Sequence, residues 1–386
     1  MKTALFETMM DFDADLARAA RIAINESLRV RAGEQVLIIT NPAPDVSVIA
    51  AALYDAALQN GARPLLIYQD VKTQFDFAES GVIAAFGAKP EVVISVSAEK
   101  LGKDAAGIAS PYRHDGREYD HIFHLQQYGL KTCRAFWSPS TTAESFARTV
   151  PVDYALLKAR CAAVKAVLDR AEAVRITAPG GTDIMVPLAG RTAFSDDGDF
   201  SAPGSGGNLP AGETFISPQN GAAHGVIAFD GSITLCEGDI VIETPVRCTV
   251  TGGLVTAVDG GREARLLLET ITGAETRAGE FETAGKLPAG AGERYARNAR
   301  NIGELGIGLN PAARISGHML EDEKAFRTCH FAIGSNYDDD APALIHLDGL
   351  VKAPTITAYL PGGGERIIEQ DGDLAIPVSG GDEKQE

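Results

Sequence analysis

Apolar residues recur in two different patterns along the chain, and the pattern changes near residue 150. In the first part, short continuous apolar runs alternate with longer segments in which apolar residues return every three or four positions. The short runs are typical of buried parallel strands, and the longer segments are typical of amphipathic helices that cover a sheet. The expected strands are 35–40, 64–70 and 90–97, and the expected helices are 16–28 and 47–61, the second capped by Gly61.

After a long helix predicted over 152–173, apolar and polar residues alternate, which is the two-residue period of a strand with one buried face. Gly, Pro and Asp turns separate these runs, and only 264–272 and 293–301 are predicted to be helical. We therefore predict a fold of the α/β plus α+β kind. It combines an N-terminal doubly wound parallel-sheet domain, 1–150, with a larger, mainly antiparallel β domain, 151–386.

The glycine-rich segment 195–208 lies shortly before Glu213. It is too short for an interdomain linker, so we interpret it as a loop beside an active site. The turn after the first strand reads TNPAPD, without a glycine-rich dinucleotide fingerprint, and the chain has no phosphate-binding loop. The first domain therefore carries no nucleotide signature.

Acidic residues outnumber basic ones, 52 to 35, and the formal net charge of −17 is spread along the chain. A surface of this sign repels phosphate backbones, so nucleic acid is not expected as a partner. No apolar stretch approaches the roughly 20 residues that cross a bilayer, and the acidic start lacks the apolar core of a secretory signal. We expect a cytoplasmic protein that does not bind membranes.

Metal-ligating side chains gather in the second half of the chain. His346 and Asp348 are two residues apart in a predicted strand, so both point to the same face and can reach one ion. Glu304 and Glu213 are each the only charged residue of an apolar segment, where a buried carboxylate requires a cation or hydrogen-bond donors. With His330, the set becomes three carboxylates and two imidazoles, which suits zinc, cobalt or iron.

Each of these residues also has a simpler interpretation. A lone glutamate is usually solvated, and a lone histidine such as His330 is more often a hydrogen-bonded core residue. Only the pair of His346 and Asp348 is difficult to reconcile with plain core packing. The sequence does not decide the role of the other histidines considered, which are His114, His121, His124 and His224.

Four segments, in this order, resemble motifs of the metallo-aminopeptidase family of aminopeptidase T: NLPAGETFISP, NIGELGIGLNP, EDEKAFRTCHFAIGSNY and IHLDG. The resemblance covers most of the chain. It implies an N-terminal α/β domain, a mainly β C-terminal domain and a two-metal site within a homodimer. The family's ligands fall on Glu213, Glu304, His330, His346 and Asp348, and its nearby tyrosine falls on Tyr337.

The resemblance implies a leucyl aminopeptidase-like enzyme that removes N-terminal residues from peptides with water activated by two divalent ions, zinc, cobalt or magnesium. Glu213 would bridge the ions. Tyr337, as a donor to the developing oxyanion, and Glu323 are the candidate catalytic residues, although Glu323 and Lys324 also fit a charge cluster at a helix end.

The same fold family includes 2,5-dihydroxypyridine 5,6-dioxygenase, so the alternative is Fe(II)-dependent ring cleavage of a dihydroxypyridine-like aromatic. A single-iron site needs two histidines and one carboxylate, and the two additional glutamates favour two ions and hydrolysis. The chain departs from the peptidase pattern at 326–329 and in a shortened stretch between His330 and His346. The substrate is therefore expected to be a small peptide or another small molecule.

Overall fold

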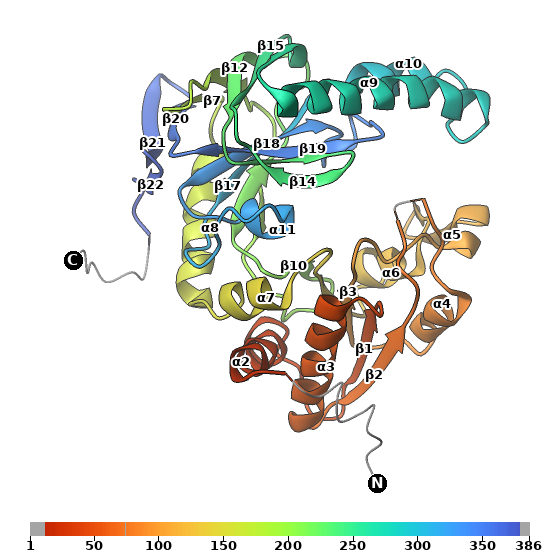
Figure 1. Ribbon diagram of the computed structural model, residues 1–386. Coiled ribbons are helices and arrows are strands. Elements are labelled where there is room, and N and C mark those ends of the chain that lie inside the picture. The colour runs from red at the N-terminus through yellow and green to blue at the C-terminus, as the bar shows by residue number, and fades with distance from the viewer. Residues whose placement is uncertain (1–11, 74, 379–386) are drawn as a thin grey trace. The chain divides into compact units, whose positions relative to one another are not determined.

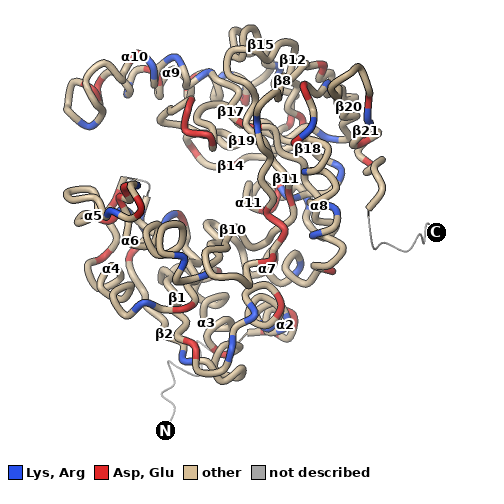
Figure 2. The backbone as a smooth tube through the Cα atoms, turned by 180° about the vertical axis from the view of Figure 1, so that it is seen from behind, with Lys and Arg blue, Asp and Glu red and all other residues tan. Residues whose placement is uncertain are grey.

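The computed structural model describes residues 12–73 and 75–378, which form two compact units (Figure 1). The first unit contains the residues up to Tyr154 together with Asp196–Ala211, and the second contains the rest of the chain. The start of the chain, on which the argument against a secretory signal depends, lies mostly outside the described residues. Acidic residues occur on many elements of both units, as the spread of charge in the sequence predicts (Figure 2).

The first unit contains a parallel sheet with helices on both of its faces. Its elements are α2 (Ala14–Ile22), β1 (Gln35–Thr40), α3 (Pro44–Gln59), β2 (Arg63–Tyr68), α4 (Ser80–Phe86), β3 (Val92–Val96), α5 (Ala105–Ala109), β4 (Tyr112–His114), β5 (Arg117–Tyr119), α6 (Ile122–His124), β6 (Arg134–Trp137), α7 (Ala143–Thr149) and β10 (Gly206–Asn208). The sheet order is β10-β6-β3-β1-β2, and every pair is parallel.

Strand β1 shows why helices cover both faces of the sheet. Ile38 packs into one core with residues of α2 and α3, whereas its neighbours Leu37 and Ile39 pack into another core with Val82 and Phe86 of α4. Successive side chains of a strand point to opposite faces, so an unbroken apolar run requires both faces to be covered. The predicted doubly wound α/β fold is confirmed.

Helix α3 also ends as predicted. Asn60 follows its last residue, and Gly61 adopts the left-handed conformation with φ of 78°. The amide of Ala62 donates to the carbonyl of Ala57, which satisfies a carbonyl group at the helix end. Gly61 can take this conformation because it has no Cβ.

The glycine-rich segment changes the predicted division of the chain into domains. Residues 196–211 belong to the first unit, where β10 pairs in parallel with β6 through Gly206 and Ala135. The second unit is therefore not one continuous stretch from residue 151. A three-residue strand of glycine and asparagine has no apolar period, so the sequence pattern gives no sign of this return to the first sheet.

The second unit is mainly antiparallel, as predicted. Its elements are α8 (Tyr154–Leu168), β7 (Ala173–Thr177), β8 (Asp183–Pro187), β9 (Phe194–Asp196), β11 (Glu213–Ile216), β12 (His224–Phe229), β13 (Ser232–Leu235), β14 (Gly238–Val241), β15 (Val246–Thr251), β16 (Leu254–Asp259), α9 (Arg262–Thr283), α10 (Gly292–Asn298), β17 (Ile302–Gly308), α11 (Met319–Asp322), β18 (Thr328–Gly334), β19 (His346–Lys352), β20 (Thr355–Leu360), β21 (Gly364–Gln370) and β22 (Asp373–Leu374). One sheet has the order β14-β13-β19-β18-β17-β11-β9, and the other has the order β16-β15-β12-β8-β7-β20-β21-β22.

Helix α9 is longer than the predicted 264–272 and continues to Thr283. Gly273 and Gly279 weaken the helix prediction beyond residue 272, because glycine costs about 1 kcal/mol in a helix interior relative to alanine. The buried residues Ile271, Ala274 and Ala278 continue one apolar face of the helix past this point. Packing of that face therefore outweighs the low helix propensity of glycine.

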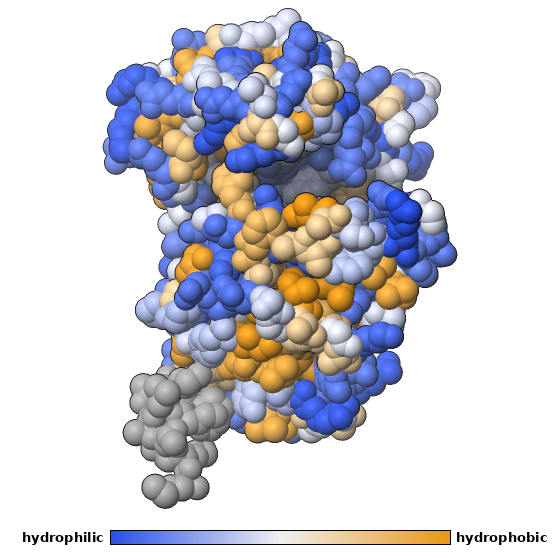
Figure 3. Space-filling view, turned by 90° about the vertical axis from the view of Figure 1, so that its right-hand side faces the viewer, coloured by the Kyte–Doolittle hydropathy of each residue, from blue (hydrophilic) through white to orange (hydrophobic). Residues whose placement is uncertain are grey.

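In the view of Figure 3, polar residues alternate with apolar ones, and apolar residues gather on the surface of the first unit. The exposed large apolar residues of that unit include Leu58, Leu65, Phe75 and Phe77. Among the described residues, no helix is both long enough and apolar enough to cross a bilayer.

Candidate metal centre

Four neighbouring strands of one sheet carry the five predicted ligands. Glu213 begins β11, Glu304 lies on β17, His330 lies on β18, and β19 carries His346 and Asp348. Each strand pairs antiparallel with the next, which brings residues far apart in sequence into one row.

The register explains why these side chains share a face. Glu304 pairs with Ala332, and Ala332 pairs with Asp348 on its other side. Directly opposed residues in an antiparallel ladder point to the same face. His330, two residues before Ala332, points the same way and lies opposite Gly306. The small side chains at Ala332 and Gly306 leave space for the larger ones around them.

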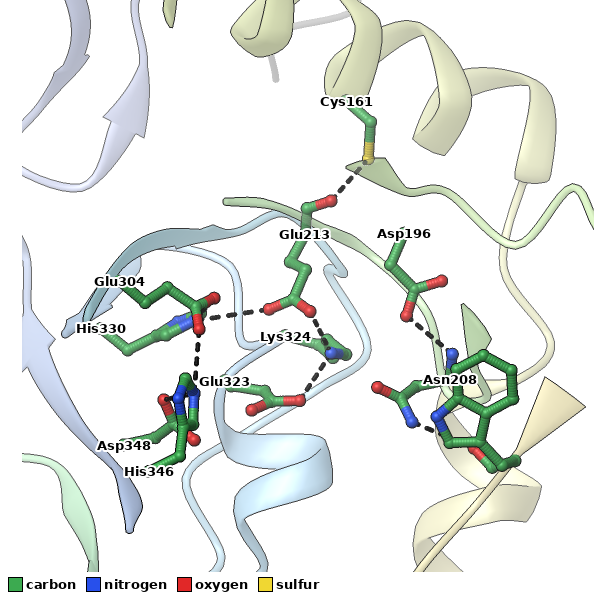
Figure 4. A network of polar contacts seen from close by, with 11 residues as sticks. Cys161, Asp196, Asn208, Glu213, Glu304, Glu323, Lys324, His330, His346 and Asp348 are labelled. Atoms are coloured by element: carbon green, nitrogen blue, oxygen red, sulfur yellow. Dashed lines mark hydrogen bonds and ion pairs between the residues drawn. The ribbon is translucent and has the colours of Figure 1, made fainter. Parts of the chain in front are cut away.

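The polar atoms of the cluster lie close together (Figure 4). His330 Nε2 is 3.5 Å from Glu213 Oε2 and 3.4 Å from Glu304 Oε1. His346 Nε2 is 3.1 Å from Glu304 Oε2 and 3.5 Å from Asp348 Oδ1. Glu304 thus presents one oxygen to each imidazole. The structure brings together all five residues that the sequence predicts as ligands.

These spacings fit a metal ion better than strong hydrogen bonds. Ligand atoms about 2.0–2.2 Å from a tetrahedral ion are about 3.3–3.6 Å from one another. Glu213 Oε2 and Asp348 Oδ1 are buried and accept no hydrogen bond among the described residues. A buried carboxylate oxygen without a donor is stabilised either by a cation or by protonation, and here two imidazoles lie beside these oxygens as further ligands. The donor set of carboxylates and imidazoles therefore fits a divalent ion.

Three overlapping groups could each hold an ion. In each group the ligand atoms lie within 4.8 Å of one another. The groups are Glu213 with Glu304 and His330, Glu304 with His346 and Asp348, and Glu323 with His330 and Asp348. Glu304 is common to the first two groups.

The two histidines differ in what supports them. His346 Nδ1 lies 2.9 Å from the carbonyl oxygen of Ser335, which suits an Nδ1–H donor and leaves Nε2 as the ligating atom. His330 Nδ1 is buried and has no hydrogen-bond partner among the described residues. The orientation of His330 therefore depends on the packing around its ring.

Lys324 lies inside the cluster. Its side chain is fully buried, and its Nζ is 2.5 Å from Glu213 Oε1 and 2.6 Å from Glu323 Oε1. Glu323 follows α11, so the helix-end assignment of this charge pair was right, but the Lys324 side chain is buried at the site and that of Glu323 is mostly buried. The sequence analysis missed Lys324 as a site residue because a lysine beside a glutamate usually lies at the surface.

The charged groups shift one another's pKa. Burial by itself would raise the pKa of Glu304, but His330 and His346 outweigh it and lower this pKa to about 2. Burial by itself would lower the pKa of His330, but Glu304 and the other carboxylates outweigh it and raise this pKa to about 9. Ligation requires neutral imidazoles, so metal ions and protons compete for these nitrogens.

The two glutamates beside Lys324 have raised pKa values. Burial raises the pKa of Glu323 to about 8, although the charge of Lys324 opposes the shift. Burial also raises the pKa of Glu213, and Lys324 again opposes it. One ammonium group thus stabilises the charged form of both carboxylates.

Tyr337 lies at the edge of the cluster. Its ring is 5.3 Å from the His346 ring, in an edge-on arrangement, and 52% of the residue is exposed. The negative charge of Glu304 raises the pKa of Tyr337 well above its usual value. The phenol therefore keeps its proton and can donate a hydrogen bond.

The remaining histidines do not join the five ligands. His121 caps α6 in the first unit by accepting a hydrogen bond from the amide of Phe123, and burial lowers its pKa. His114 and His124 belong to the same unit and face Asp115 and Asp120. His224 is exposed at the start of β12. These placements provide no second histidine cluster for a metal among the described residues.

Replacing Lys324 by methionine should lower the free energy of unfolding of the metal-free protein by about 3–5 kcal/mol, because two buried carboxylates lose their cation. Urea denaturation in a chelating buffer measures this change. Lys165→Met is the matched control. Lys165 pairs with Asp169 four residues away and is one-third exposed, so its loss should cost less than about 1 kcal/mol. Equal losses for the two variants would contradict a central role for Lys324.

The model of one protein family, 2,5-dihydroxypyridine 5,6-dioxygenase, matches residues 138–333, just over half of the chain. The chain belongs to this family. The matched range contains Glu213, Glu304 and His330, and it ends before His346 and Asp348. The part of the chain that matches the family model therefore includes three of the five predicted ligands.

Among the solved structures that match, two resemble nearly the whole chain. The 2,5-dihydroxypyridine dioxygenase of Pseudomonas putida KT2440 is 18% identical, with a TM-score of 0.67, and the match covers 95% of this chain and 99% of that one. AmpT of Thermus thermophilus is also 18% identical, with a TM-score of 0.64, and the match covers 94% and 99%. These likenesses show the fold. No curated protein sequence matches the chain.

The comparisons confirm the relation inferred from the motifs. The dioxygenase family and the aminopeptidase T fold both match, as expected of one group of proteins. The dioxygenase of Pseudomonas putida KT2440 and AmpT share the fold of this group. The choice between these chemistries therefore depends on the site itself.

Proposed function

We propose that the protein is a metal-dependent aminopeptidase with a two-ion centre. The observation that carries this proposal is the position of Glu304, whose two carboxylate oxygens face two different histidines. A carboxylate shared between two ligand groups is suited to bridge two ions. A centre for a single ion has no need of such a shared group.

The ligands would divide into the two groups that meet at Glu304. Glu213 and His330 would complete one group, and His346 and Asp348 would complete the other. The motifs suggested Glu213 as the residue that bridges the two ions. Glu304 is better placed for this role, because Lys324 already contacts one oxygen of Glu213. Ions held in this way would lower the pKa of a water molecule and polarise the carbonyl of a peptide bond.

Two further residues of the chain would act on the substrate. Tyr337 keeps its proton and lies next to His346, so its hydroxyl would donate a hydrogen bond to the carbonyl oxygen as negative charge develops there. Glu323 lies within reach of the atoms of His330 and Asp348, and in its charged form, which Lys324 stabilises, it would receive a proton from the attacking water. The homodimer that the resemblance implies stays a prediction.

The second candidate is Fe(II)-dependent cleavage of a dihydroxypyridine-like ring. Lys324 favours it, since its ammonium group already compensates Glu213 and Glu323 and so reduces the need for a second ion. His330, His346 and Asp348 would then supply the two histidines and one carboxylate that are typical of non-haem iron oxygenases. The description of the matching family names this activity.

The metal content of the purified protein separates the two candidates. We expect two zinc or cobalt ions per chain by elemental analysis, and hydrolysis of leucyl dipeptides that falls at least about 100-fold on chelation and returns when metal is added. One iron per chain, with oxygen consumed in the presence of 2,5-dihydroxypyridine, would establish the dioxygenase instead. Full hydrolytic activity after chelation would refute the metal-dependent mechanism.

A further inference from the structure

Three aromatic rings form a continuous row beside the metal centre. The rings of Phe194 and Phe215 are stacked at 5.4 Å, and the rings of Phe215 and Tyr337 are 4.9 Å apart. Tyr337 in turn meets the candidate ligand His346 at 5.3 Å. We call Phe194, Phe215 and Tyr337 the aromatic row. It begins at a candidate ligand and extends away from it.

The strand geometry places the row next to the ligands. Phe215 lies two residues after Glu213 on β11, so both side chains point to the same face of the sheet. Phe194 is on β9, the strand beside β11 at the edge of the same sheet. The face that carries the ligands therefore continues as an aromatic surface.

The backbone that carries Tyr337 is held in place by polar contacts. The amide of Tyr337 lies 3.3 Å from the hydroxyl of Ser217, to which it donates. Asp340, three residues further on, forms a 2.9 Å ion pair with Arg191, and the side-chain amide of Asn336 donates to the same carboxylate. Tyr337 is thus fixed before any substrate binds, which lowers the entropic cost of binding.

The aromatic row is accessible to a ligand. Phe194 is 41% exposed and Tyr337 is 52% exposed, although aromatic side chains normally bury most of their area. Ring faces that remain exposed beside a buried polar cluster are typical of binding sites, which combine apolar walls with a few convergent polar groups. Core packing alone does not explain this arrangement.

We propose that the aromatic row binds an aromatic or large apolar side chain of the substrate, namely that of the N-terminal residue of a peptide. This inference rests on the proposed peptidase function and specifies its substrate class. The row starts at the ring that contacts His346, so a side chain that lies along it belongs to a residue next to the reacting carbonyl. In an aminopeptidase, that group is the side chain of the residue being released.

The test compares the dipeptides Phe-Gly and Ala-Gly as substrates of the zinc-loaded protein. We expect the wild type to prefer Phe-Gly in kcat/KM by at least about tenfold, and Phe215→Ala to lose most of this preference, mainly through KM. Phe194→Ala should reduce the same ratio, and the exposure of Phe194 makes this variant unlikely to disturb folding. Phe77→Ala, which truncates an exposed phenylalanine of the first unit, should leave the ratio unchanged.

A binding measurement separates this inference from the proposed function. Calorimetry with L-phenylalaninamide and L-alaninamide should show tighter binding of the aromatic amide, and the difference should shrink in Phe215→Ala and Phe194→Ala. If the protein cleaves no peptide but keeps this difference, the peptidase proposal fails and the aromatic row stands as a binding surface. If neither the kinetic ratio nor the binding difference changes in the variants, the aromatic row does not contact the substrate.

Discussion

Replacing Glu304 by glutamine should release bound metal and lower catalytic activity by at least about 1,000-fold, because one carboxylate serves both ligand groups. Glutamine has nearly the same shape, but its amide group presents a donor where the second imidazole needs an acceptor or an ion. The apparent affinity for zinc should therefore fall by more than about 100-fold, which exceeds the usual effect of losing an outer hydrogen-bond partner. Elemental analysis and calorimetric metal titration measure this loss directly.

Glu369→Gln is the matched control for this substitution. Glu369 is fully buried on β21 in the same unit, and burial raises its pKa well above the usual value. Burial therefore favours the neutral form of this carboxyl group, and a neutral amide of nearly the same shape should change little. Metal content and activity should match those of the wild type in Glu369→Gln and be lost in Glu304→Gln. If Glu304→Gln still held two ions, Glu304 would not bridge them.

Replacing Gly306 by alanine should displace His330 without removing any ligand. A Cβ at Gly306 would overlap Nε2 and Cε1 of the His330 ring, since the two residues are directly opposed in the β17–β18 ladder. The imidazole would have to move away from Glu213 and Glu304. A displacement of about 1 Å in a catalytic group can cost about 100-fold in rate, so we expect at least that loss together with reduced metal content.

Gly273→Ala provides the control for the glycine substitution. Gly273 lies in α9, and a Cβ there would meet nothing within 4 Å. Alanine should stabilise this helix by up to about 1 kcal/mol and leave metal binding unchanged. Wild-type metal content in both variants would show that the His330 ring does not occupy the space above Gly306. The thermal unfolding midpoint distinguishes a local displacement from a general loss of folding.

Local patterns predicted most of the architecture. Continuous apolar runs require two covered faces, and alternating runs require one, so the parallel sheet of the first unit and the antiparallel sheets of the second follow from the spacing of apolar residues. The return of 196–211 to the first sheet could not be predicted. Strand β10 consists of two glycines and an asparagine, which show no alternation of apolar and polar residues. The length of α9 was underestimated for a related reason, since its apolar face extends past a glycine.

The sequence by itself determined which residues could hold a metal. Glu213 and Glu304 are isolated charges in apolar segments, and the spacing of His346 and Asp348 places both on one face of a strand. Only the tertiary structure decided how these residues act together. Glu304 faces both histidines and Lys324 joins the cluster, because strand register and helix packing bring together residues that are far apart in the chain. Gly306 and Phe215 matter for the same reason, since their effect depends on contacts across the sheet that no local pattern encodes.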